Sequence, residues 1–104
     1  MTFTGNEGAV ITLAEGSKMT AAYRATISTG DTIALAVGKN LVNSILGQTG
    51  CMGIRMYFAL DKDGNKQLVL VGVDANGNDM TTGIIVDNLV SCPSYCPIKN
   101  SLNS

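Results

Sequence analysis

The stretch GIRMYFALDKDGNKQLVLVGV, residues 53–73, decides the fold of this chain. Over residues 53–60, side chains alternate between two sides, and an alternation of period two is typical of a β-strand. Residues 61–65 have the Asp and Gly composition of a hairpin loop. Residues 67–73 form the next predicted strand, which is apolar on both faces. The stretch therefore predicts an antiparallel hairpin that carries apolar side chains on both faces, although burial of one face would need them on that face only.

The turn chemistry of this hairpin recurs further along the chain. The pattern Asp-x-(Asp/Asn)-Gly-Asn occurs at residues 61–65 and again at residues 74–78, and residues 83–86 look like a third strand. Asp and Asn are typical of turns because they bond to their own backbone, but such loops also resemble calcium sites. An EF-hand loop needs Gly at its sixth position and Glu at its twelfth, which these loops lack. We expect turns, with calcium binding as the alternative.

A first helix is predicted from a capping box. The Thr12 hydroxyl would accept a hydrogen bond from the amide of Glu15, whose side chain would reach back to Thr12. The helix is expected to run to about Ile27, with Met19, Tyr23 and Ile27 as its buried stripe, since they stand four residues apart.

A second helix is predicted over residues 39–47, whereas residues 32–38 fit either a strand or a helix. Together these segments predict an α+β fold, with two N-terminal helices packed on a small antiparallel β-meander and an irregular C-terminal tail. A chain of 104 residues has the size of one domain. We divide it into an arm (1–11), a helical part (12–47), the β-meander (53–87) and a tail (88–104).

The chain carries few charges. Charged residues are 14% of the sequence and the net charge is −1, whereas a typical soluble domain has about 25% charged residues. Mean hydropathy is +0.22. Either the core is large or part of the surface is meant to be covered. The seven basic residues are scattered, so we expect no nucleic-acid partner.

Histidine is absent. Ser-His-Asp and Cys-His mechanisms and His-centred zinc sites are therefore excluded. Paired carboxylates or a lysine nucleophile could still do chemistry, but neither arrangement is visible in the sequence. We predict that the chain is not an enzyme and has no catalytic residue, cofactor or metal site.

The most distinctive local motif is Cys-Pro-Ser-Tyr-Cys at residues 92–96. Its spacing differs from the Cys-x-x-Cys of thioredoxins and zinc ribbons. Three interpretations stay open: a local Cys92–Cys96 disulfide, a metal site that adds Cys51, or buried free thiols. Cys51, at the start of a predicted strand, is expected to be buried.

The longest nearly apolar run is residues 33–37, far short of the ~20 residues of a membrane span. We expect no membrane span. Residues 1–6 also lack the basic and apolar blocks of a secretory signal. A cytoplasmic location is therefore expected, unless the chain is processed or exported by another route.

Several stretches resemble a group of small uncharacterised bacterial proteins. They are residues 50–55, the end of the hairpin at residues 70–74, residues 76–79, and the tail with Cys92–Cys96 and residues 103–104. The similarity covers most of residues 12–104. It implies a bacterial, single-domain protein and brings no activity, cofactor or site residue.

Two functional hypotheses follow. The first is a self-associating structural protein, a homo-oligomer or filament subunit, because the sheet face away from the helices would leave an apolar patch of a kind that monomers rarely expose. Its candidate residues are Tyr57, Val69, Val71, Val73 and Ile85. Alternatively, the arm or the tail folds over that face. The second hypothesis is a small, non-catalytic ligand-binding or thiol/disulfide-stabilised module, with Cys92 and Cys96 as the disulfide candidates.

Overall fold

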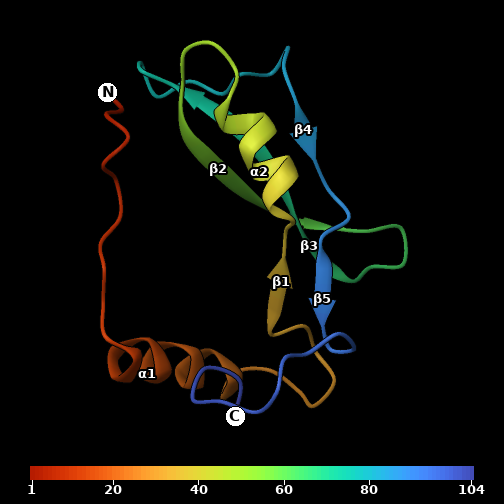
Figure 1. The fold of residues 1–104 in the computed structure, drawn as a ribbon. Helices are drawn as coiled ribbons and strands as arrows, with labels where there is room; N and C mark the ends of the chain where they lie inside the picture. The colour runs from red at the N-terminus through yellow and green to blue at the C-terminus, as the bar shows by residue number, and fades with distance from the viewer.

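The hairpin expected from residues 53–73 forms the larger of two sheets in a computed structural model that describes all 104 residues (Figure 1). Strands β2 (Cys51–Leu60) and β3 (Lys66–Asp74) pair antiparallel, with a register irregularity at Gly53. The short strand β4 (Ile85–Val86) pairs with the other edge of β3. The order β2-β3-β4 confirms the predicted meander.

The two repeated Asp loops are turns with the same hydrogen bonds. Asp61 Oδ1 accepts the amides of Asp63 and Asn65, each at 2.9 Å. Asp74 Oδ1 accepts the amides two and four residues further on, at 2.9 and 3.0 Å. The glycine at the fourth position has a φ of 81° in one loop and 80° in the other, which favours glycine. Each first carboxylate therefore organises its own turn.

Helix α2 (Lys39–Leu46) has nearly the predicted bounds and covers part of one face of this sheet. Its Ile45 is completely buried against Leu70, Val86 and Leu89. These four side chains form the core cluster, and only 8 of 104 residues are buried in the whole chain. The core is therefore small and local to α2.

Helix α1 (Leu13–Arg24) begins at the predicted capping box. The amide of Glu15 donates to the Thr12 hydroxyl at 3.1 Å, and the amide of Thr12 donates to the Glu15 carboxylate at 3.3 Å. The expected burial is wrong, because no residue of α1 is buried. Met19 is 67% exposed, and Ile27 lies beyond the end of the helix. The reason is position: α1 lies beside the C-terminal loop and covers neither face of the sheet (Figure 1).

A second sheet of two strands was not predicted. Strand β1 (Ala34–Ala36) pairs antiparallel with β5 (Val90–Cys92). The segment 32–38, which fitted either element, therefore holds a strand, and the tail expected to be irregular supplies its partner. The α+β class is confirmed, while the packing of both helices on one sheet is corrected: α2 packs there and α1 does not.

Candidate assembly surface

Strand β2 lies at the edge of the larger sheet and leaves one side unpaired. It is ten residues long and pairs only with β3. Natural edge strands are usually short or carry Lys or Pro, which discourage pairing with another chain. β2 contains neither residue, and its single charged side chain is Arg55. This edge of β2 therefore has no neighbouring strand.

A row of apolar side chains lies along β2 on the face that α2 partly covers. Met56 is 56%, Phe58 95% and Leu60 71% exposed. The sequence predicted that helices would cover this face, which is wrong for the outer end of β2. α2 is only eight residues long and packs near Ile54, and α1 lies elsewhere.

The opposite face of the sheet carries the five predicted self-association residues. Tyr57 and Ile85 are 48% and 54% exposed, and Val69 is partly buried. Val71 and Val73 are only 4% and 1% exposed within the single chain. These two valines therefore cannot form a docking surface. The exposed part of the predicted patch is limited to Tyr57, Ile85 and part of Val69.

The two valines have different neighbours on β2. Val71 lies across from Arg55, and Val73 lies across from Gly53, where the ring of Phe3 packs. The N-terminal arm thus reaches back over this face, as in the alternative considered from the sequence. Its contact is confined to the end of the strands that holds Gly53.

Asp79 joins two β2 side chains on this face. The Arg55 guanidinium forms an ion pair with Asp79, and the Tyr57 hydroxyl donates a hydrogen bond to the same carboxylate. The hydrogen bond from Tyr57 and the neighbouring Arg55 lower the pKa of Asp79. The same hydrogen bond raises the pKa of Tyr57. The only charge on β2 is therefore neutralised by the chain itself, so the strand offers little charge repulsion to a partner.

Helix α1 is held by polar contacts near its C-terminal end. Arg24 Nη1 donates to the carbonyl of Leu102. The Lys66 ammonium donates to the Tyr23 hydroxyl at 2.7 Å and lies 5.2 Å from the centre of that ring. The hydroxyl raises the pKa of Lys66 by accepting this bond. These contacts fix where α1 lies without burying its apolar side chains.

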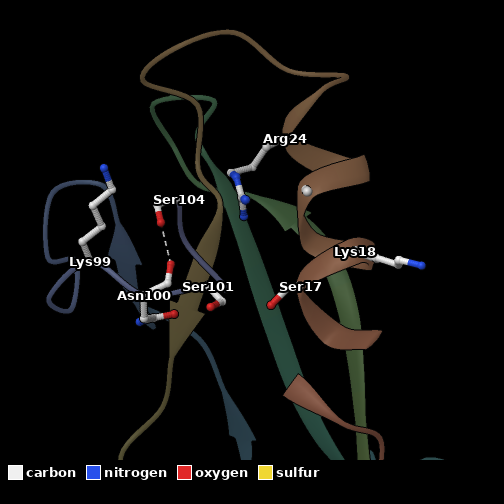
Figure 2. A pocket seen from close by; sticks show the side chains of 8 residues that line it. Ser17, Lys18, Arg24, Lys99, Asn100, Ser101 and Ser104 are labelled. Carbon is white, nitrogen blue, oxygen red and sulfur yellow. Dashed lines mark hydrogen bonds between the residues drawn. The ribbon is translucent and has the colours of Figure 1, made fainter. Parts of the chain in front are cut away.

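A hollow of about 590 Å³ lies between α1 and the C-terminal loop. Figure 2 shows Ser17 and Arg24 directed toward that loop, whereas Lys18 points away from it. On the other wall, the Ser104 hydroxyl donates to the carbonyl of Asn100 at 2.7 Å. The hollow is lined almost entirely by polar and basic residues.

Cys92 and Cys96 form a disulfide with a Cα–Cα distance of 4.6 Å. Their sulfurs are thus not thiolates, which rules out the metal site and the buried free thiols considered for this pair. Cys51 is free and partly buried, and its thiol lies 3.2 Å from the carbonyl of Gly53. The disulfide closes the loop that follows β5.

Two features of this surface were not found from the sequence. The Asp79 contacts have no local signal, because Asp79 lies 24 residues from Arg55 and 22 from Tyr57. The Phe3 contact has a weak signal in the sequence. A glycine within a predicted strand often marks the close approach of another segment, and Gly53 is such a glycine.

Comparison of the chain with protein-family models, with curated proteins and with solved structures finds no match. Neither helix has the length and apolar character needed to cross a membrane.

Proposed function

We propose that the chain is a structural subunit that associates with copies of itself through strand β2. The observation that supports this most is the unprotected edge of β2, which runs for ten residues beside a row of exposed apolar side chains. Long apolar edges of this kind pair readily with other strands. Two β2 strands paired antiparallel would join two three-stranded sheets into one across a two-fold axis.

The surface area of the chain supports the same proposal. Its accessible surface is 7415 Å², whereas a compact monomer of this mass has roughly 5,500 Å². Its radius of gyration is 15.3 Å, against about 13 Å for a compact domain of ~100 residues. A standard interface covers about 800 Å² of each partner. The excess thus corresponds to about two interfaces per subunit, enough to connect more than two copies.

A pair of lysine substitutions tests the role of β2. Phe58→Lys places a charge in the apolar row, where the side chain is 95% exposed, so the fold of the monomer should be unaffected. Ile98→Lys is the matched control, because Ile98 is 90% exposed but lies in the tail. Light scattering should find the unmodified chain and the control as multiples of 10.8 kDa at micromolar concentration, and Phe58→Lys closer to the monomer.

Two results would count against the proposal. One is an unmodified chain that stays at 10.8 kDa over the whole concentration range. The other is an equal loss of mass in both variants, because association would then depend on general surface hydrophobicity instead of β2.

The disulfide supports a second candidate, a non-catalytic disulfide-stabilised binding module. In this case the hollow between α1 and the C-terminal loop would hold the ligand. Its basic lining, with Arg24 and Lys99, favours a small anion. A titration of the monomer with inorganic phosphate and sulfate, followed through the amide resonances of the C-terminal loop, tests it. No shift at millimolar anion would remove this candidate.

A further inference from the structure

The first residues of the chain form a small plug on the larger sheet. We use plug for residues 1–5. The ring of Phe3 packs on Gly53, where a Cβ atom would lie only 2.6 Å from Phe3 Cε1. The amide of Phe3 donates to the carbonyl of Ala75 at 2.8 Å, and Met1 lies against Gly77. A site made of glycine and backbone groups therefore receives this ring, and we call Gly53, Ala75 and Gly77 the socket.

The segment between the plug and α1 has no such attachment. We call residues 6–11 the connector. Val10 is fully exposed, and nothing lies within 4 Å of the Cβ position of Gly8. The hydrogen bonds at its start stay within residues 4–7. Figure 1 shows the arm running separately from the sheet down to α1, where Ile11 lies 3.6 Å from the Cβ position of Gly16. The connector therefore joins the plug to α1 without packing on the sheet.

We infer that the plug of one copy occupies the socket of the next copy in the assembly. This inference rests on the proposed self-association and identifies a second contact in addition to β2. An exchanged plug makes the same contacts with Gly53 and Ala75 as the plug within one chain does. Exchange of an identical element in this way is a low-cost route to association. The unpacked connector allows it, since six extended residues reach about 20 Å.

The exchanged contact has a direction. Plug and socket are different groups, so when a copy gives its plug to one neighbour and receives the plug of another, the joint is head-to-tail. A two-fold pairing of β2 closes on itself and ends with two copies. The plug joint adds a further link to each copy, which extends the assembly instead of closing it.

A complementation experiment isolates the plug joint. Every chain carries Phe58→Lys, which removes the β2 contact. One chain lacks residues 1–5 and keeps its socket. The other keeps its plug and carries Gly53→Val, a residue suited to a strand whose Cβ displaces the Phe3 ring. Exchange predicts that each is monomeric alone and that their mixture forms a 1:1 complex by light scattering. The control mixture, in which the second chain also carries Phe3→Ala, stays monomeric.

A single substitution provides an independent measurement if Gly53→Val does not fold. Phe3→Ala in the otherwise unmodified chain leaves the socket intact and removes the ring. Exchange predicts that the protein concentration needed for assembly rises by about tenfold or more, because the Phe3 ring is the apolar group that packs on Gly53. An unchanged concentration would overturn the inference, since the plug would then act only within its own chain.

The outcomes separate the inference from the proposed function. If the unmodified chain assembles but the mixture gives no 1:1 complex and Phe3→Ala assembles normally, the plug exchange is overturned and association through β2 stands. If the unmodified chain is a monomer at all concentrations, both are overturned. A 1:1 complex in the mixture, absent from the control mixture, supports the exchange when Phe3→Ala also raises the concentration needed for assembly.

Discussion

The two helices relate to the rest of the chain in opposite ways. α2 has eight residues and no side-chain cap, yet it buries Ile45 completely and organises the core cluster. α1 has twelve residues and a complete capping box, yet buries none of them. Local capping therefore determines where a helix begins, whereas packing depends on which sheet face the chain brings it to. The part of the molecule around α2 has a buried core, whereas α1 has none.

The largest loss of stability should come from a substitution in the core around α2. Ile45→Ala removes a completely buried side chain and leaves a cavity, so we expect the free energy of unfolding to fall by about 2–5 kcal/mol. Met19→Ala on α1 is the counterpart, at a side chain that is 67% exposed, and should change that free energy by less than about 0.5 kcal/mol in the monomer. Urea unfolding measures both. A similar loss in the two variants would mean that α1 packs in solution.

The disulfide should have the next largest effect. Cys92 and Cys96 are four residues apart, and closing so short a loop is worth roughly 2 kcal/mol in the chain-entropy estimate. The double substitution to Ala should lower the free energy of unfolding by about that amount. It should also loosen β5 from β1, because Cys92 pairs with Ala34. Amide hydrogen exchange at residues 34–36 checks this, and unchanged protection there would contradict the account.

A smaller effect is expected at the cap of α1. Thr12→Ala removes the hydroxyl that accepts the amide of Glu15, which is worth about 1 kcal/mol of helix stability. Because α1 buries no side chain, the loss should be local. Helical circular dichroism should fall while the urea midpoint of the whole domain stays the same. A matching fall in the urea midpoint would show that α1 unfolds together with the core.

The smallest effect concerns pH. The lowered pKa of Asp79 means that its bonds to Arg55 and Tyr57 stabilise the fold above the ordinary carboxyl pKa of about 4. That contribution is lost as pH falls through the lowered pKa. The raised pKa of Tyr57 means that its own contribution is present below about pH 10 and is lost at higher pH. Tyr57→Phe should therefore be destabilised at pH 7, and the difference from the unmodified chain should shrink as pH falls through the lowered pKa of Asp79. A difference independent of pH would exclude the hydrogen bond as its cause.

The parts of the fold that sequence reasoning found depend on neighbours along the chain. The capping box at Thr12, the turns at Asp61 and Asp74 and the alternation in β2 each follow from contacts a few residues apart. The hairpin could be predicted for the same reason, since its turn sets its register.

The missed features depend on partners far away along the chain. β1 is recognisable only once β5 pairs with it, since Ala34 meets Cys92. The side-chain amide of Gln67 bonds to both backbone groups of Leu89, which places the segment just before β5 beside β3 without any periodic signal. The exposed end of β2 was missed because alternation shows that a face is apolar but not whether a helix reaches it.

Amide hydrogen exchange of β2 tests the central claim most directly. At the edge of an isolated sheet, the β2 amides that do not bond to β3 face solvent and should exchange rapidly. If β2 strands of two copies pair, these amides become protected as the protein concentration rises, and Phe58→Lys abolishes this protection. Rapid exchange of the same amides at every concentration, in a sample that light scattering shows to be assembled, would contradict association through β2.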